Sequence, residues 1–181
     1  LAAGSGTNTI SEILTNTSTA PVDVTYSITT TANACPNTQE IKVTVYPAPT
    51  LTSSLTPAAI CSGTSFDYTI ASATVGTTFS WVRLSAAGIT SNAATNIGAG
   101  SSISEVLTNS TVSFIEVTYR ITLTANGCSS KRLVVVAVNP TPSVASVSNK
   151  VFCNNSVAVV NFSGTTVSNS SYTWTNDNMD L

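Results

Sequence analysis

The stretch Ile115-Glu116-Val117-Thr118-Tyr119-Arg120-Ile121-Thr122-Leu123-Thr124 decides the class of fold. Its odd-numbered positions are apolar or aromatic, and its even-numbered positions carry charges or hydroxyl groups. Successive side chains of an extended strand point to opposite faces, so this alternation predicts a strand with one buried and one solvated face. No segment of the chain has a helical apolar stripe longer than two turns, and we therefore expect an all-β protein.

Residues 22–31 alternate in the same way, and the sequence around both stretches recurs at a constant offset of 93 residues. Ile10-Ser11-Glu12-Ile13-Leu14-Thr15-Asn16 returns as Ile103-Ser104-Glu105-Val106-Leu107-Thr108-Asn109. Thr31-Ala32-Asn33-Ala34-Cys35 returns as Thr124-Ala125-Asn126-Gly127-Cys128. A duplicated segment of this length is a whole small domain rather than a solenoid repeat of roughly 20–50 residues.

The repeat predicts three parts of the chain. Residues 1–49 correspond to the C-terminal half of a unit, residues 50–142 to a complete unit, and residues 143–181 to the N-terminal half of a third. A complete unit is long enough to bury the core of a small sandwich. We expect the two half units to be ordered only if they pair with each other or with chain outside this sequence. We also expect the sequence to be a piece of a longer protein.

Within the complete unit, alternation and turn signals predict about seven short strands, a number typical of immunoglobulin-like sandwiches. Besides the opening stretch, we expect strands at residues 65–72, 78–84, 102–108 and 133–138. Asn126-Gly127 lies before the last strand and is a strong signal for a tight hairpin. The predicted fold is therefore all-β, with tandem immunoglobulin-like sandwiches in which one complete unit is flanked by two half units.

Two proline-rich segments, Val45-Tyr46-Pro47-Ala48-Pro49 and Val138-Asn139-Pro140-Thr141-Pro142, close the units. Each proline fixes its own φ angle and disfavours helix at the residue before it. We therefore expect short, semi-rigid connectors and an extended array of units.

The composition excludes several classes of partner. Charged residues make up 8% of the chain, whereas ordinary globular domains contain roughly 25%. The net charge of −2 offers no basic face, so we expect no nucleic-acid partner. No stretch approaches the roughly 18 apolar residues of a membrane-spanning helix, so we expect no direct membrane span.

The chain contains no histidine, so a Ser-His-Asp or Cys-His catalytic arrangement is impossible within it. Glu12 and Glu105 are copies of one position, and we interpret them as solvated strand residues. Asp177-Asn178-Met179-Asp180 lacks the glycine and the distal glutamate of an EF-hand loop, so we interpret it as a polar turn. We expect no catalytic residue, no metal site and no cofactor, and hence no enzyme.

Four cysteines permit three pairings. Our first choice is a disulfide within the complete unit, from Cys61 to Cys128, which would leave Cys35 and Cys153 unpaired. Sandwich topology argues against it, because the first turn and the last hairpin lie at opposite ends, beyond the Cα separation of about 7 Å that a disulfide allows. Free buried thiols are one alternative, and bridges across the unit boundaries (Cys35 to Cys61, Cys128 to Cys153) are another. Zinc binding by the cysteines is the weakest alternative, because the chain has neither a CxxC motif nor a histidine.

Four aromatic residues are predicted to pack in sandwich cores. Trp81 and Trp174 occupy equivalent positions in Phe79-Ser80-Trp81 and Tyr172-Thr173-Trp174. An exposed indole could serve as a carbohydrate platform, but a tryptophan repeated on a central strand more often packs the core. Tyr26 and Tyr119 are copies of each other on the apolar face of their strands, and we place them in the core as well.

The landmarks, taken in order, resemble those of a known family. They are Ile60-Cys61-Ser62-Gly63, Phe79-Ser80-Trp81, residues 103–109, Val117-Thr118-Tyr119, Ala125-Asn126-Gly127-Cys128 and Asn139-Pro140-Thr141-Pro142. The pattern is similar to the PKD-like (immunoglobulin-like) repeats of giant cell-surface proteins of Bacteroidota, which look like gliding-motility adhesins exported by type IX secretion. The third copy departs from it, since Asn154-Asn155 stands where Ser62-Gly63 stood, although Cys153 still matches Cys61. The resemblance implies an extracellular protein at the cell surface.

Two classes of function fit these observations. The first is a structural stalk or spacer in a large secreted adhesin that acts in surface adhesion and gliding motility. Its partners would be neighbouring repeats of the same long chain. The second is a binding module whose loops or exposed sheet face recognise a surface glycan or another cell-surface protein.

Overall fold

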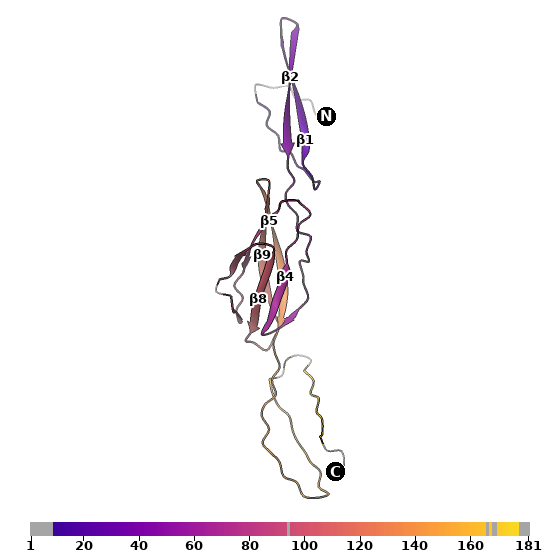
Figure 1. The fold of residues 1–181 in the computed structure, drawn as a ribbon, viewed down its shortest axis with the longest axis vertical. Coiled ribbons are helices and arrows are strands. Elements are labelled where there is room, and N and C mark those ends of the chain that lie inside the picture. The colour runs from indigo at the N-terminus through magenta and orange to yellow at the C-terminus, as the bar shows by residue number, and fades with distance from the viewer. Residues whose placement is uncertain (1–8, 94, 166, 168–169, 178–181) are drawn as a thin grey trace.

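The computed structural model describes residues 9–93, 95–165, 167 and 170–177. Figure 1 shows an elongated molecule in which a hairpin, a sandwich and a C-terminal segment follow one another along the long axis. Every regular element among the described residues is a strand, which confirms the all-β prediction. The same residues contain no helix long and apolar enough to cross a bilayer.

The strands form a hairpin followed by two packed sheets. The hairpin pairs β1 (Val22–Ala32) with β2 (Cys35–Val45). The sandwich has a five-stranded sheet of order β3-β10-β9-β5-β7 and a three-stranded sheet of order β4-β8-β6. Its strands are β3 (Ile60–Cys61), β4 (Thr64–Thr69), β5 (Thr78–Arg83), β6 (Ile89–Ser91), β7 (Ile97–Ala99), β8 (Ser102–Asn109), β9 (Ile115–Ala125) and β10 (Cys128–Asn139).

The longer strands overlap those predicted from alternation, although β4 ends at Thr69 rather than at residue 72 and β10 begins at Cys128 rather than at residue 133. The short strands β6 and β7 were not predicted. Each of these two strands has only three residues, which is too short for a period of two to be visible. β3 pairs with β10 in parallel and the other pairs are antiparallel, so the complete unit is an immunoglobulin-like sandwich.

The core lies between the two sheets and is built entirely from the complete unit. Tyr119 on β9 is fully buried and stacks on Phe66 of the opposite sheet, with ring centroids 5.2 Å apart. Trp81 on β5 meets the same tyrosine edge to face at 5.8 Å. The buried hydrophobic cluster comprises Phe66, Tyr68, Ile70, Trp81, Ile103, Leu107, Val117, Tyr119, Ile121, Leu123, Val134, Val136 and Val138. Because all of these residues fall within 50–142, this unit contains a core of its own.

The N-terminal hairpin has the register of β9 and β10. Val22 pairs with Val45 as Ile115 pairs with Val138, and the remaining pairs follow at the same offset. The two turns also share a backbone conformation, since Asn33 and Ala34 have φ angles of 52° and 64° where Asn126 and Gly127 have 49° and 76°. Two positive φ angles are the requirement of a type I′ turn. Glycine accepts that conformation readily, whereas alanine does not.

We therefore expect Ala34→Gly to stabilise the hairpin by about 1 kcal/mol, because it removes the cost of a left-handed alanine. Hydrogen exchange of the β1 and β2 amides should slow roughly fivefold, since that factor corresponds to about 1 kcal/mol. The reverse exchange in the copy, Gly127→Ala, should destabilise the complete unit by a similar amount. Unchanged protection in the first variant would show that this turn does not limit hairpin opening.

The C-terminal segment contains no strand among its described residues 143–165, 167 and 170–177. It turns back on itself, because Ala145 N–H donates to the Ser163 carbonyl at 2.7 Å and Phe162 stacks on Tyr172 with centroids 6.1 Å apart. The two flanks of the sandwich therefore differ: one is a regular hairpin and the other is an irregular excursion. The unit boundaries at 49/50 and 142/143 stay a prediction from the repeat.

Candidate functional site

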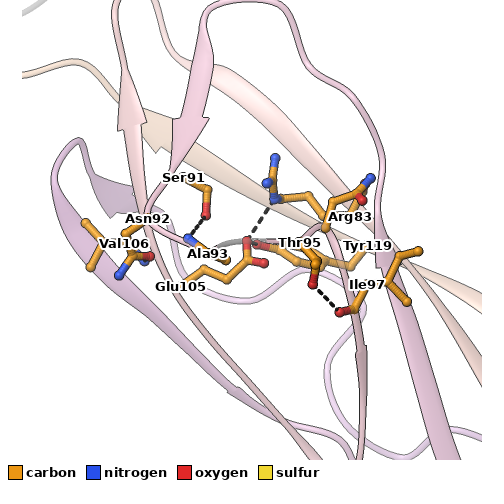
Figure 2. Close-up of polar contacts among 10 residues, drawn as sticks. Arg83, Ser91, Asn92, Ala93, Thr95, Ile97, Glu105, Val106 and Tyr119 are labelled. Atoms are coloured by element: carbon orange, nitrogen blue, oxygen red, sulfur yellow. Dashed lines mark hydrogen bonds and ion pairs between the residues drawn. The ribbon is translucent and has the colours of Figure 1, made fainter.

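A charged cluster lies between the two sheets of the complete unit (Figure 2). Glu105 extends inward from β8 and is 2% exposed. Its Oε2 accepts a hydrogen bond from Arg83 Nε of β5 at 2.8 Å and another from the Tyr119 hydroxyl of β9 at 2.9 Å. One carboxylate oxygen thus ties the smaller sheet to two strands of the larger one.

The surroundings of the cluster are nearly dry. The Arg83 side chain is 14% exposed, and Glu105 Oε1 has no hydrogen-bond partner in the part of the chain that the structure describes. Burial raises the pKa of Tyr119 far above its ordinary value of 10.0, and the negative charge of Glu105 adds to this effect. The phenol therefore stays protonated and remains a donor to the carboxylate across the whole neutral range.

The interpretation of Glu105 as a solvated strand residue is wrong. The alternation of β8 places it on the buried face, between Ile103 and Leu107. That position was readable from the sequence, but its partner was not, because Arg83 lies 22 residues earlier on another sheet. The copy of Glu105, Glu12, is exposed and accepts a hydrogen bond from Tyr26, which is the copy of Tyr119. The acid–tyrosine pair therefore belongs to the repeat.

A second polar network also recurs in both copies. The Asn109 side-chain amide donates to the carbonyls of Ser113 and Val138, each at 2.8 Å, and its Oδ1 accepts from Thr111 N–H at 2.9 Å. At the same offset, the Asn16 amide donates to Ala20 at 2.8 Å and Val45 at 2.7 Å, while its Oδ1 accepts from Ser18 N–H at 2.9 Å. These asparagines fix the turn that precedes the hairpin.

All four cysteines are free, and the Cys61–Cys128 disulfide that was our first choice is not formed. Cys61 pairs beside Asn139 at the end of β10, whereas Cys128 begins that strand. Twelve residues of strand separate the two positions by roughly 35 Å at about 3.3 Å per residue, far beyond the reach of a disulfide. The boundary bridges are not formed either. Cys35, Cys61 and Cys153 are exposed and Cys128 is half-buried, so they are not the buried thiols of the other alternative.

The four predicted core aromatics occupy different environments. Trp81 is 7% exposed and Tyr119 is fully buried, as the sandwich core requires. Tyr26 is half-buried on the hairpin, and Trp174 is 73% exposed on the C-terminal segment. The structure therefore packs Trp81 and Tyr119 together in one core, whereas Tyr26 and Trp174 lie outside it.

The connector between hairpin and sandwich is packed on the unit that follows it. Pro47 and Pro49 are buried. The Ser130 hydroxyl on β10 donates to the Pro49 carbonyl, and the Cys128 thiol lies 3.9 Å from the Tyr46 carbonyl. The connector thus contacts the start of β10 through the backbone carbonyls of Tyr46 and Pro49.

The second connector provides an internal comparison. Pro140 is buried, but Pro142, the copy of Pro49, is exposed. The segment after Pro142 has no strand among its described residues, so nothing there plays the part that β10 plays for Pro49. Docking of the connector therefore goes together with a complete unit on its C-terminal side.

The charged groups in these features pair with one another. Arg83, Glu105 and Tyr119 hold one another, and the described residues contain no group of three or more side chains able to bind a metal. In the predicted polar turn, Asp177 is exposed, and Asn178, Met179 and Asp180 lie outside the described residues. Asp23 is also exposed, where Lys42 and Thr44 lower the pKa of its carboxyl by hydrogen bonding.

The raised pKa of Tyr119 predicts a loss of stability in alkali. Below the ordinary pKa of 10.0 both states hold the proton, so the contribution is complete. Above it the unfolded chain releases the proton while the folded chain keeps it, so the free energy of unfolding should fall as the pH rises. Urea unfolding across this range should show a shallower fall for Tyr119→Phe. Some slope should persist, because burial also raises the pKa of Tyr68; identical slopes in both proteins would contradict the assignment.

The fold and the cluster together define an immunoglobulin-like sandwich module whose buried polar groups hold its sheets together. The chain belongs to the PKD-like domain family, whose pattern matches residues 1–49 and 58–142, well over half of its length. The unmatched residues 50–57 directly follow the connector Val45-Tyr46-Pro47-Ala48-Pro49. Domains of this family are usually extracellular structural or binding modules and are typically non-catalytic. A comparison with curated proteins gives no match.

Proposed function

We propose that this chain is a spacer segment of a large secreted cell-surface adhesin. In this role, PKD-like units placed end to end hold a distal adhesive or motile tip away from the cell, and the tip acts in surface adhesion and gliding. Export by type IX secretion belongs to the same proposal. The observation that carries the spacer role is the packed connector, in which Pro49 is buried against the next unit and held by Ser130.

The packed connector supports a spacer because a stalk must resist bending at its joints. Beyond Pro49, Thr52 N–H donates to the Ala71 carbonyl and Val135 N–H donates to the Leu55 carbonyl, each at 2.9 Å. These bonds anchor the incoming chain to two different parts of the sandwich. The units therefore follow one another along the long axis and do not fold back (Figure 1).

The surface of the sandwich also suits a spacer. The charged residues that face inward, Arg83 and Glu105, form an ion pair with each other between the sheets. A nearly uncharged exterior rich in threonine, serine and asparagine gives no strong field that would attract a charged ligand. The alternative of a glycan-binding module loses one candidate platform, because the indole of Trp81 is buried in the core.

The spacer role is tested by the stiffness of the joint. Backbone ¹⁵N relaxation of the full chain, at concentrations where it is monomeric, should show the hairpin and the sandwich tumbling together. Replacing Pro47 and Pro49 with glycine and Ser130 with alanine should release the hairpin and shorten its apparent correlation time. Pro142→Gly, at the exposed proline of the other connector, is the matched control and should leave this joint unchanged. Independent tumbling in the unmodified chain would refute a stiff spacer.

A further inference from the structure

The two cysteines of the complete unit lie at opposite ends of one strand. Cys128 is the first residue of β10, and Cys61 pairs beside Asn139, which is the last. Cys61 is exposed and Cys128 is half-buried, and both are free. The length of β10 keeps them beyond the reach of a disulfide within the unit. Each unit therefore carries one thiol at each of its two ends.

The joint between hairpin and sandwich shows what lies next to the thiol of Cys128. Its Sγ is 3.9 Å from the backbone carbonyl oxygen of Tyr46, the residue that follows β2. Tyr46 belongs to the unit before the sandwich, so this thiol lies at the boundary between two units that are arranged end to end (Figure 1). By the offset of 93 residues, Tyr46 is the copy of Asn139.

The carbonyl of Asn139 shows what accompanies the same position in a complete unit. It accepts a hydrogen bond from the Ser62 N–H at 2.8 Å, and Ser62 directly follows Cys61. The hairpin has the strand register of β9 and β10, so the equivalence of Tyr46 and Asn139 holds for the backbone as well as for the sequence. The carbonyl that Cys128 approaches is therefore the copy of the carbonyl beside which Cys61 lies.

Each joint between two complete units thus brings two thiols to one carbonyl group. One is Cys61 of the first unit, and the other is Cys128 of the unit that follows. Contacts of 2.8 Å and 3.9 Å to a single oxygen atom make the two backbones neighbours at this point, where a disulfide needs Cα atoms within about 7 Å.

This pairing is the reverse of the boundary bridges considered from the sequence. Those bridges would join the late cysteine of one unit to the early cysteine of the next, as in Cys35 to Cys61. Cys35 begins β2, and the 11 residues of that strand separate it from the joint. Cys61 lies at the far end of the sandwich from the same joint. The topology therefore favours the early cysteine of one unit with the late cysteine of the next.

We propose that Cys61 of one PKD-like unit forms a disulfide with Cys128 of the unit that follows it. The oxidant is a small-molecule disulfide of the extracellular medium, where protein disulfides persist. The thiolate of one cysteine attacks the sulfur–sulfur bond of the oxidant and releases one small thiol, and the second cysteine then displaces the other. The two cysteines lose two electrons and two protons, and the oxidant leaves as two thiols.

A bridge at this point gives each joint a second covalent link beside the proline connector. A joint crossed by one chain segment can rotate about that segment, whereas two separate links fix its orientation. The bridge goes beyond the spacer role, because it requires only consecutive units and does not depend on what they hold apart. Cys35 and Cys153 are the copies of Cys128 and Cys61, so the same rule applies to them.

The test uses a protein of two consecutive copies of residues 50–142, since this unit has a core of its own. The forward variant carries Cys128→Ser in the first copy and Cys61→Ser in the second, so only the two cysteines at the joint remain. After treatment with a mixture of oxidised and reduced glutathione, its intact mass should fall by two hydrogen atoms. Neither cysteine should then react with a maleimide.

The reversed variant is the matched control. It carries Cys61→Ser in the first copy and Cys128→Ser in the second, which leaves the same two residue types at the outer ends of the pair. At the same ratio of oxidised to reduced glutathione, its internal bridge should form at least about tenfold less, because the folded joint no longer raises the effective concentration of the thiols. In urea the difference between the two variants should disappear.

Two results would overturn the proposed bridge. The first is a forward variant whose cysteines stay free or carry only glutathione. The second is equal bridging of the forward and reversed variants without urea, which would show that chain flexibility and not the joint brings the thiols together. A forward variant that bridges while reduced units tumble independently would refute the stiff spacer and leave this disulfide standing.

Discussion

Trp81→Ala is expected to lower the free energy of unfolding of the 50–142 unit by about 3–5 kcal/mol, as removal of a buried tryptophan does. The indole contacts Tyr119 edge to face and is covered on its other side by Gly98, where an added Cβ would lie 2.3 Å from the ring. Truncation leaves a cavity that neither the backbone at Gly98 nor the aromatic stack can fill. Urea unfolding of the isolated unit measures the loss.

The chain offers its own control for this substitution. Trp174 is the copy of Trp81 but is 73% exposed, so Trp174→Ala in the monomeric full chain should leave the unfolding of the sandwich unchanged. Equal effects of the two substitutions would contradict the distinction between a core indole and an uncovered one. A stable Trp81→Ala unit that had lost binding to a glycan array would instead favour the binding-module hypothesis.

Arg83→Met is expected to cost about 3–5 kcal/mol, because it leaves the carboxylate of Glu105 buried without a counter-charge. Glu105 is 2% exposed and keeps only the hydroxyl of Tyr119 as a donor once Arg83 is lost. Denaturant unfolding of the 50–142 unit gives the loss directly. Arg120→Met, at an exposed position on β9, is the matched control and should change stability little.

The double variant Arg83→Met with Glu105→Leu distinguishes a charge effect from lost packing. Replacement of both partners of a buried ion pair by apolar residues is often neutral or stabilising, so the double variant should recover most of the loss. If it is as unstable as the single variant, the energetic role assigned to the ion pair is wrong. The stability of Arg83→Lys should fall between that of Arg83→Met and that of the double variant, because lysine keeps the charge but not the planar geometry of the guanidinium.

The strands of the sandwich could be predicted because their alternation is a local property of the chain. Ile115 to Thr124 specifies its own buried face, and the repeat carries that assignment to the N-terminal hairpin. The type I′ turn at Asn126-Gly127 was also readable, because only a few residue pairs tolerate two positive φ angles. The short strands β6 and β7 were not predicted, because three residues are too few to distinguish a strand's alternation from chance.

Only one part of the polar cluster, the burial of its glutamate, could be predicted from the sequence. The burial of Glu105 follows from its position between Ile103 and Leu107 on one face of β8. Its pairing with Arg83 depends on how the two sheets face each other, which no local pattern encodes. The disulfide prediction failed for the same reason: the repeat shows which cysteines are equivalent, but only the topology shows that Cys61 and Cys128 lie at opposite ends of β10.

The repeat also explains why residues that maintain the fold are easier to identify in this chain than residues that bind a partner. The tyrosine–acid pair and the asparagine network occur in both copies, as contacts of a shared fold would. Residues that differ between the copies are the places to look for a function of one unit alone. Arg83 is one of them, because Asn176 stands at its equivalent position in the third copy, and the ion pair that Arg83 forms is internal to the sandwich.

The most direct test of the account is small-angle scattering from tandem proteins that contain two, three and four copies of residues 50–142. A spacer built on packed connectors predicts that the maximum dimension increases by one fixed step for every unit added, while the cross-section stays that of a single sandwich. The spacer role would be contradicted if the maximum dimension increased much less than in proportion to the number of units. A scattering profile of a compact, globular particle would contradict it as well.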